Sequence, residues 1–340
     1  MPREGDYLES ADGLVFAVKG LVHPPNYIIA FPKYFPTRGG TRKAGLKRYA
    51  KISSLGGFYS FLRSTHPEYL RYDPAFNDFL SEVPYAKVVR YFSPTRNLDK
   101  LLEREVSSLD DVEKDVVNFV QLLKAKSGIT RRSIGMSGSV MVGLHTKRSD
   151  LDLVIYGVKA CRSVYDTLSK LTHEGSGPVK PYSKVDLVKL YRSRVLDTPI
   201  PLQRFLSVEG RKVLQGKYGD RDYFIRLVKE PAEAGEAYGD SKYSTLGFVT
   251  LKAEVVDADD SIFTPCLYRV GKVSLMNRVH GNEVKEIVSF RGRFCEQAKN
   301  FEKVLVRGKL ERVTSRGGEY CRVVVGSRPG DYMVPVENAG

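Results

Sequence analysis

Apolar and polar residues follow patterns that divide the chain into three regions. In the first, residues 13–22 and 26–35 are rich in branched and aromatic side chains, which predicts two strands joined by a proline-containing turn. Residues 53–70 have a helical pattern that begins after a glycine pair. We therefore expect residues 1–100 to form a mixed β/α domain.

The second region, residues 101–236, begins with a long helical stretch from Leu98 to Lys126, which Gly128 ends. Its apolar residues recur at helical spacing. They are Val112, Val116, Phe119, Val120 and Leu123. A short strand or turn at Ile134, the first turns of a helix over 139–144 and a strand over 150–156 are expected next.

Three more helices are expected over 161–175, 183–196 and 201–216, followed by a strand over 221–230. Ser183 and Asp186 have the spacing of a capping box, which places a helix start at Ser183. Alternation of strands and helices predicts an α/β (α+β) core with a mixed sheet in residues 101–236.

In the third region, residues 237–340, the pattern changes to strands over 246–256, 285–294, 302–313 and 319–326. The last two strands are expected to form a hairpin with Arg316-Gly317-Gly318 at its tip. We expect a small β-barrel, weakly similar to oligonucleotide-binding (OB) barrels. Its basic residues predict either an anion-binding face or solvated charges. They are Arg291, Arg293, Arg307, Lys309, Arg312 and Arg316.

The candidate chemistry lies in the second region, where a Gly138-Ser139 turn precedes Asp150 and Asp152. Side chains two apart on a strand share a face, so both carboxylates point the same way. Carboxylate oxygens are preferred ligands of Mg²⁺, which also binds substrate phosphates. Glycine lets backbone N–H groups approach phosphates closely, and the Ser139 hydroxyl is a further donor. Each motif alone also fits a plain turn or a solvated strand end.

Taken in order, these motifs resemble the DNA polymerase β-like nucleotidyltransferase superfamily over roughly residues 112–229. The resemblance rests on Gly138, Ser139 and Gly143, then on Asp150 and Asp152. It implies two Mg²⁺ (or Mn²⁺) ions held by the aspartates and by a third carboxylate from a later strand. It also implies a nucleoside triphosphate substrate bound at the glycine turn, with the basic Lys147 and Arg148 nearby. Gly143 is expected to let its helix pack closely on the sheet.

The third carboxylate has two candidates. Asp222 lies in an expected strand and is the one we favour. Asp186 is the alternative, but its capping box argues for a helix start, where a carboxylate meets the helix dipole.

The net charge of +14 favours an anionic partner. One segment concentrates basic residues without any acidic one, and interleaved aromatic residues suit stacking on unpaired bases. The residues expected to contact nucleic acid are Lys33, Arg38, Arg42, Lys43, Lys47 and Arg48. A mobile, merely solvated loop is the alternative for this segment.

We therefore expect an enzyme that transfers a nucleoside monophosphate to an acceptor hydroxyl, with RNA or DNA as acceptor. One alternative is a non-catalytic nucleic-acid-binding or complex-forming protein, and another is a nucleotidyltransferase that modifies a protein or small molecule. No run of about 18 apolar residues occurs, so no membrane partner is expected, and the location is expected to be cytoplasmic. The four cysteines have no CxxC spacing, so buried free thiols are expected rather than zinc.

Overall fold

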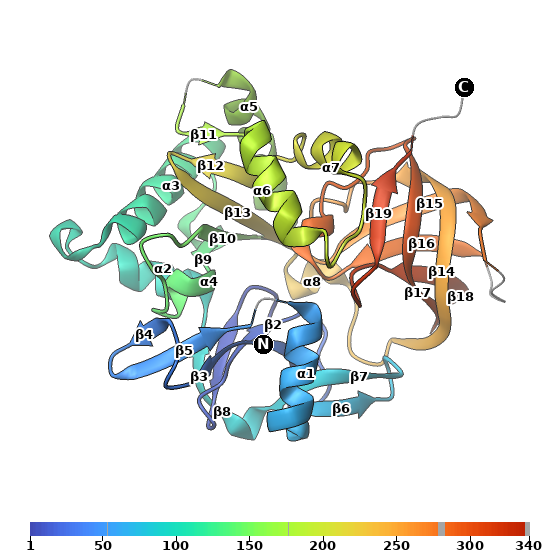
Figure 1. Cartoon of the computed structure of the whole chain (residues 1–340), viewed down its shortest axis with the longest axis horizontal. Coiled ribbons are helices and arrows are strands. Elements are labelled where there is room, and N and C mark those ends of the chain that lie inside the picture. Colours follow the sequence, from blue (N-terminus) through green and yellow to red (C-terminus); the bar gives the residue numbers. More distant parts are fainter. Residues whose placement is uncertain (53, 176, 278–282, 337–340) are drawn as a thin grey trace.

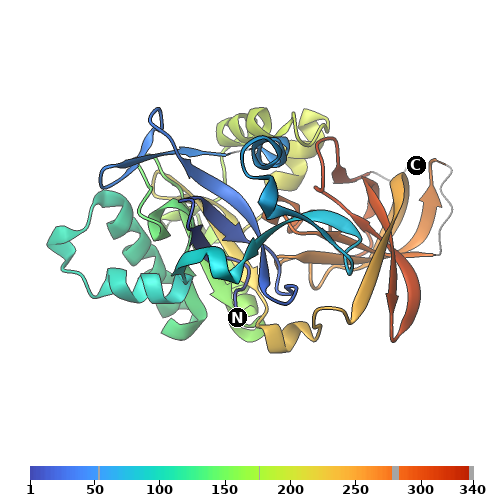
Figure 2. The same ribbon diagram turned by 90° about the horizontal axis from the view of Figure 1, so that it is seen from below.

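Three sheets that follow one another along the chain make up a mixed α/β fold (Figure 1). The computed structural model describes residues 1–340 except 53, 176, 278–282 and 337–340. The N-terminal sheet lies below the central sheet in this view, and a curled third sheet lies beside both. Seen from below, the N-terminal sheet lies in the foreground, and the curled sheet lies to its right (Figure 2).

The N-terminal sheet has the order β4-β5-β3-β2-β1-β8, and β7 pairs with both β3 and β6. Its strands are β1 (Tyr7–Ser10), β2 (Val15–Val18), β3 (Tyr27–Pro36), β4 (Arg42–Ala44), β5 (Lys47–Lys51), β6 (Leu70–Asp73), β7 (Asp78–Pro84) and β8 (Val88–Phe92). Helix α1 (Leu55–Thr65) begins after Ser54, whose hydroxyl accepts the N–H of Gly57. The two expected strands are confirmed. The helix expected over 53–70 is shorter, because Pro67 starts a separate 3₁₀ turn and Leu70 already belongs to β6.

The central sheet has the order β11-β12-β13-β10-β9. Strand β10 pairs antiparallel with β9 and parallel with β13. The strands are β9 (Ile134–Met136), β10 (Leu151–Tyr156), β11 (Val179–Lys180), β12 (Gln215–Tyr218) and β13 (Arg221–Val228). The helices are α2 (Pro94–Leu102), α3 (Asp111–Ser127), α4 (Gly138–Met141), α5 (Val158–Glu174), α6 (Lys184–Arg194) and α7 (Leu202–Glu209).

Helix α3 buries the whole expected apolar stripe. It starts at the capping box of Asp110 and Glu113 and ends at Gly128. The φ of Gly128 is 68°, in the left-handed region, which glycine adopts most easily because it has no Cβ atom. The expectation of one helical stretch from Leu98 to Lys126 is wrong. The polar segment after α2 forms a 3₁₀ turn over Val106–Ser108, and the Asp110 cap starts a separate helix.

Strand β10 is buried on both of its faces. Leu151, Leu153 and Ile155 belong to the large core that includes α3 and α5, as the alternation of the sequence predicts. The opposite face is covered by the N-terminal segment. There the Tyr156 hydroxyl donates to the carbonyl of Glu4, and a side chain at Gly5 would meet Val154 at 3.0 Å.

Two further expectations in this region need correction. Helix α7 ends at Glu209 rather than at Gly216, because Gln215–Tyr218 pairs antiparallel with β13 as strand β12. Helix α4 is a single turn that stops at Met141, and Gly143 follows with a φ of 68°. In contrast, α6 begins at the expected Ser183–Asp186 capping box, with both of its hydrogen bonds present.

The third sheet closes on itself. Its strand order is β14-β15-β16-β18-β17, and β17 also pairs with β14, while β16 and β18 run parallel. A sixth strand, β19, pairs with β17. The strands are β14 (Ser241–Asp257), β15 (Cys266–Leu275), β16 (Val284–Ser289), β17 (Lys303–Ser315), β18 (Gly318–Val324) and β19 (Tyr332–Pro335). The expected hairpin between β17 and β18 is confirmed, with Ser315 opposite Gly318.

A short helix, α8 (Pro231–Ala234), connects the central sheet to this curled sheet. The four cysteines are buried free thiols, as expected.

Candidate functional site

Asp150 and Asp152 lie where β10 begins. Asp150 immediately precedes the strand and is exposed, while Asp152 is half-buried within it. Because side chains alternate along a strand, both carboxylates lie on the face opposite Leu151 and Leu153. This is the face that the N-terminal domain covers.

Asp222 lies on the neighbouring parallel strand β13. The register pairs Leu151 with Tyr223 and Asp152 with Phe224, so Asp222 is level with Asp150. Paired residues of adjacent strands point to the same face, and Asp222 therefore shares the face of Asp150 and Asp152. Three carboxylates thus come from the starting ends of two adjacent strands.

Gly138 lies directly against Asp152. A Cβ atom at Gly138 would lie 2.0 Å from Oδ2 of Asp152, which leaves room for hydrogen only. The φ of this residue is +62°, a conformation that also favours glycine. The preceding residue ties the turn to β10, because the N–H of Ser137 donates to the carbonyl of Asp152 at 2.8 Å. The glycine turn and the aspartate pair therefore form one continuous structure.

The electrostatics of Asp152 follow from this crowding. Burial raises the pKa of Asp152 to about 6, and the negative charge of Asp150 acts in the same direction. The positive charges of Arg226, Lys51 and Lys33 oppose the shift. Burial and Asp150 thus destabilise the ionised form of Asp152, and nearby positive charges stabilise it.

Part of that positive charge comes from the N-terminal sheet. Lys33 and Lys51 lie on β3 and β5, and a hydrogen bond of 2.9 Å joins the N–H of Ile52 to the carbonyl of Lys33. Burial lowers the pKa of Lys33 to about 7, and the charges of Lys19 and Lys51 lower it further. Lys33, expected from sequence to contact nucleic acid, thus faces the aspartates instead of lying in an open loop.

A buried ion network continues behind the aspartates. Glu4 is fully buried and accepts from Nζ of Lys19 at 2.9 Å and from the N–H of Gly20 at 2.8 Å. Nε of Arg226, on β13, lies 3.4 Å from the same carboxylate. Buried charges of this kind persist only when they are paired. The N-terminal segment therefore belongs to the floor of the site.

The loop between α4 and β10 is held by side-chain hydrogen bonds. The Ser139 hydroxyl donates to Oγ of Ser149 at 3.1 Å, and Arg42 donates to the carbonyl of Leu144 at 3.0 Å and to Ser149 at 3.2 Å. Tyr34 lies beside the same turn. Burial raises its pKa to about 12, and the charges of Asp152 and Asp150 contribute to the increase.

These contacts change the expected roles of two residues. Ser139 is buried, and its hydroxyl already has partners, whereas the expectation was a free donor. Gly143 was expected to allow close packing on the sheet, but a Cβ atom there would meet nothing within 4 Å. Gly143 is required for its positive φ, which ends the single turn of α4.

The two basic residues expected at the triphosphate are on the surface of this loop. Lys147 and Arg148 are both exposed. The carbonyl of Lys147 accepts from Arg221 at 2.5 Å, and Arg221 is itself paired with Asp115 of α3 at 2.6 Å. The loop backbone is therefore anchored while its basic side chains face solvent.

The two candidates for the third carboxylate are in different settings. Asp186 lies in the first turn of α6, where its carboxylate binds Ser183 and where that hydrogen bond lowers its pKa. Asp222 lies on the strand beside β10, with Nζ of Lys217 at 2.6 Å. Nζ of Lys217 also lies 4.0 Å from Oδ1 of Asp186, so this lysine contacts both candidates. The preference for Asp222 stays a prediction.

The remaining basic residues expected to contact nucleic acid are on the β4–β5 hairpin. Lys43, Lys47 and Arg48 are exposed, as is Arg38 in the preceding turn. Arg42 is the exception, because it is bonded to the loop before Asp150. The hairpin extends beside α2 and α4 (Figure 1). It therefore forms a basic rim next to the aspartates.

The basic residues of the third sheet do not form a uniform anion-binding face. Arg291 and Arg293 both contact Asp197, at 3.3 and 3.7 Å. Lys309 is paired with Asp78 and Glu311, at 2.7 and 2.6 Å. These side chains join the barrel to the other two domains.

Among the described residues, Asp12, His66 and Glu68 of the N-terminal domain have ligand atoms within 4.8 Å of one another, whereas Asp150, Asp152 and Asp222 share a face without being this close. Nζ of Lys87 lies 3.6 Å from Glu68 and 4.0 Å from Asp12. Asp222 likewise has a lysine partner, Lys217 at 2.6 Å, so a nearby cation does not separate the two groups. The aspartates at β10 and β13 differ in lying beside the glycine turn.

Comparison of the sequence with known proteins shows a relative. The chain is 30% identical over 332 residues to MJ1086 of Methanocaldococcus jannaschii, an uncharacterized protein, and the match covers 95% of this chain and 94% of that protein. The chain belongs to the family of MJ1086. No protein-family model matches the sequence, and no solved structure matches it. In the part of the chain that the structure describes, no helix is long and apolar enough to cross a membrane.

Some residues of the site carry no signal in the sequence. Arg226 is outside the motif, and Glu4, Lys19 and Tyr34 are distant from it along the chain. Arg226 lies four residues after Asp222, which places it on the same face of β13. That spacing is the one clue that could have identified it.

Proposed function

We propose that this protein is a metal-dependent nucleotidyltransferase that transfers a nucleoside monophosphate from a nucleoside triphosphate to an acceptor hydroxyl of a nucleic acid. The observation that carries the proposal is the common face of Asp150, Asp152 and Asp222 next to the Gly138 turn. The single α4 turn between β9 and β10 agrees with the superfamily motif.

The residues present fit a divalent cation. All three groups are carboxylates, the ligand type that Mg²⁺ and Mn²⁺ prefer. The pKa of Asp152 is raised mainly by burial and further by the charge of Asp150, and a bound cation would offset both effects. Asp150, Asp152 and Asp222 would hold the metal. When bound there, two such ions lower the pKa of the attacking hydroxyl and stabilise charge on the phosphates and the leaving group.

The glycine turn suits the triphosphate. Among the described residues, the N–H groups of Gly138 and Ser139 have no hydrogen-bond partner, and backbone N–H groups at such turns bind phosphate oxygens. Lys33 and Lys51 add positive charge beside Asp152. Lys147 and Arg148 are exposed on the loop and available for the outer phosphates.

In the proposed reaction, the acceptor oxygen forms a new bond to the α-phosphorus. The bond from that phosphorus to the oxygen bridging to the β-phosphate breaks, and pyrophosphate leaves with the electron pair. The hydroxyl proton passes to a carboxylate, and the exposed Asp222 is the group we assign to receive it. Tyr34 and Arg42 act only by holding the turn and loop in place.

The β4–β5 hairpin supports nucleic acid as the acceptor. Its exposed cations Lys43, Lys47 and Arg48 lie on an element that is attached through Arg42 to the loop preceding Asp150. Cations in this position neutralise backbone phosphates without reading sequence.

The test is incubation with α-labelled nucleoside triphosphates and separate pools of RNA, DNA and protein. The proposal expects Mg²⁺- or Mn²⁺-dependent label on a nucleic acid, and at least a hundredfold less with Asp150→Asn. Label on protein alone would transfer the assignment to protein modification. Equal labelling by Asp150→Asn would exclude these aspartates from the chemistry.

One observation favours a second candidate, a non-catalytic nucleotide- or nucleic-acid-binding protein. Lys217 lies 2.6 Å from Asp222 and supplies positive charge where a metal ion would otherwise be needed. If this lysine replaces the metal, wild type binds nucleotide without turnover in every divalent cation tried. Turnover by wild type would reject this candidate.

A further inference from the structure

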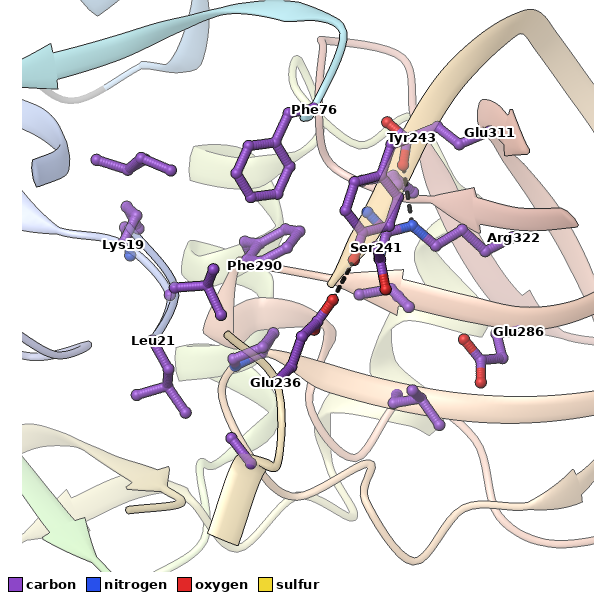
Figure 3. A pocket seen from close by; sticks show the side chains of 18 of the residues that line it. Lys19, Leu21, Phe76, Glu236, Ser241, Tyr243, Glu286, Phe290, Glu311 and Arg322 are labelled. Carbon is purple, nitrogen blue, oxygen red and sulfur yellow. Dashed lines mark hydrogen bonds and ion pairs between the residues drawn. The ribbon is translucent and has the colours of Figure 1, made fainter. Parts of the chain in front are cut away.

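A large cavity lies between the N-terminal domain and the outer surface of the barrel, away from the aspartates. Its volume is about 730 Å³, within the usual range of small-molecule sites. Lys19 and Leu21 line one side, and Glu311 and Arg322 of the barrel line the other (Figure 3). The segment from Ala234 to Ser241, which joins the central sheet to the barrel, lines a further part.

The cavity is distinct from the proposed triphosphate site. Lys229, which lines it, follows β13 at the end opposite Asp222. Seven residues of extended strand separate the two, which corresponds to roughly 23 Å. A ligand in the cavity would therefore not contact the aspartates.

Aromatic rings form the centre of the cavity. Phe76 stacks on Tyr243 with ring centroids 5.4 Å apart and an interplanar angle of 1°. Phe290 lies beside this pair and faces the cavity (Figure 3), and a Cβ atom at Gly20 would lie 3.8 Å from its ring. Aromatic side chains bind flat heteroaromatic rings, such as nucleobases, by stacking. This stacking depends little on which base is bound, because every base has a π-face.

The charges in the wall argue against a phosphate-rich ligand. Lys309 is paired with Asp78 and Glu311, at 2.7 and 2.6 Å. Arg322 binds Glu311 at 2.9 Å and lies 3.8 Å above the ring of Tyr243. Lys309 and Arg322 thus have carboxylate partners, as do Lys19 and Lys229 in the same wall, so most of its positive charge is balanced.

Hydrogen-bond acceptors are present instead. Glu236 accepts the hydroxyl of Tyr243, and Glu286 accepts that of Tyr320, each at 2.9 Å. A carboxylate has about four acceptor positions, so both retain capacity toward the cavity. Ring N–H groups and exocyclic amino groups of nucleobases donate hydrogen bonds to carboxylates, as the amino group of cytosine does.

The topology of the barrel gives independent support. Five strands close in the order β14-β15-β16-β18-β17, the size of the Greek-key barrels that bind oligonucleotides through the loops after their first and fourth strands. Here these are the loop between β14 and β15 and the turn between β17 and β18. Both line the cavity, through Phe263 and Thr264 in one and Arg316 in the other.

We propose that this cavity binds an unpaired nucleobase, carried by a free nucleoside or by a single-stranded nucleic acid. The base stacks on Phe290 and the Phe76–Tyr243 pair, and its donors reach Glu286 or Glu236. The proposal does not depend on nucleotidyl transfer, since a protein without that activity could bind a base in the same way.

The test is equilibrium dialysis of the full chain, without divalent cations, against labelled adenosine, guanosine, cytidine and uridine and against single-stranded hexanucleotides. At least one ligand is expected to bind, with at least tenfold weaker binding to Phe290→Leu. Phe79→Leu is the matched control, because Phe79 is an exposed ring of β7 outside the cavity. Its affinity is expected to equal that of wild type.

If Phe290→Leu does not fold, as judged by its melting transition, Glu286→Gln replaces it and is expected to lose at least fivefold for the preferred base. Nucleoside binding alone would identify a free nucleoside, and strand binding at least tenfold tighter would identify a nucleic acid. Absence of binding to wild type, or binding unchanged by both variants, would overturn the proposal.

Discussion

Gly138 is the residue whose identity the candidate site restricts most. A methyl group there would overlap Oδ2 of Asp152, and its φ of +62° adds strain for any other residue. We predict that Gly138→Ala lowers divalent-cation affinity and nucleotide transfer at least a hundredfold, because Asp152 must move. Binding calorimetry and the labelled transfer assay measure both effects.

Gly143→Ala is the matched control, since Gly143 has a similar φ of +68° but open space around its Cβ position. It is expected to lose about 1–2 kcal/mol of stability and to keep metal affinity within threefold. Equal loss of metal affinity in both variants would mean that backbone strain, and not the contact with Asp152, explains the effect.

Asp152 makes stability depend on pH. Its folded pKa of about 6 lies above its ordinary value of 3.8, so the folded protein holds a proton that the unfolded chain releases between these values. Its contribution is therefore present below pH 4 and is lost as the pH rises through 6, by about 3 kcal/mol at most. Denaturant unfolding from pH 4 to 7 should show this decline in wild type and a flatter profile in Asp152→Asn.

The same proton competes with metal. As the pH falls through about 6, Asp152 becomes neutral, so the affinity for Mn²⁺ should fall in parallel. Metal affinity that stays constant from pH 7 to 5 would place the ion elsewhere.

Single substitutions at Asp222 and Asp186 distinguish the two candidates for the third carboxylate. Asp222→Asn should reduce transfer at least thirtyfold, because Asp222 shares the face of Asp150 and Asp152. Asp186→Asn should leave transfer within threefold and cost about 0.5–1 kcal/mol of stability, as expected for the loss of a helix-capping charge. The opposite ranking in the transfer assay would identify Asp186 as the functional carboxylate.

At the scale of elements, the β4–β5 hairpin is predicted to hold nucleic-acid phosphates. Replacing Lys43, Lys47 and Arg48 by alanine should lower the slope of log affinity against log salt by about 2 for single strands. The control removes Lys126, Lys159 and Lys170, which are exposed on α3 and α5, across the sheet from the aspartates. Filter binding over a salt series would contradict the account if both sets changed the slope equally.

Elements with a strong local signal could be predicted from the sequence. The apolar stripe and caps of α3, the alternation of β10 and the capping box of α6 depend on residues close in the chain. The helix predicted over 201–216 is longer than α7, because Gln215–Tyr218 becomes a strand only by pairing with β13, which local sequence does not reveal. Strand β15 is not among the expected strands, although the alternation of Cys266, Tyr268 and Val270 with less buried residues is a strand pattern that the sequence contains.

At the scale of the whole molecule, the aspartates and the glycine turn could be located from sequence, whereas their surroundings could not. Glu4, Lys19 and Lys33 come from the N-terminal sheet and meet β10 and β13 only through tertiary packing. The cavity beside the barrel likewise requires all three domains. A motif specifies its own residues, but nothing in it specifies which domain covers it.

The coupling between domains gives one further prediction. Glu4→Gln removes the buried partner of Lys19 and Arg226, which leaves uncompensated charge in the interior. We expect a loss of about 3–5 kcal/mol in the free energy of unfolding, measured by denaturant titration. Glu9→Gln, a half-exposed neighbour on β1, should change it by less than about 0.5 kcal/mol. Similar values for both variants would contradict the importance of the buried network.

The central claim is that three carboxylates on β10 and β13 hold the metal for nucleotidyl transfer. The most direct measurement is an anomalous difference map from crystals grown with Mn²⁺ and a non-hydrolysable nucleoside triphosphate. We predict manganese within coordination distance of Asp150 and Asp152, with Asp222 completing the site and the triphosphate on the Gly138 turn. Manganese at Asp12, His66 and Glu68 alone, or nucleotide bound with no metal at the aspartates, would contradict it.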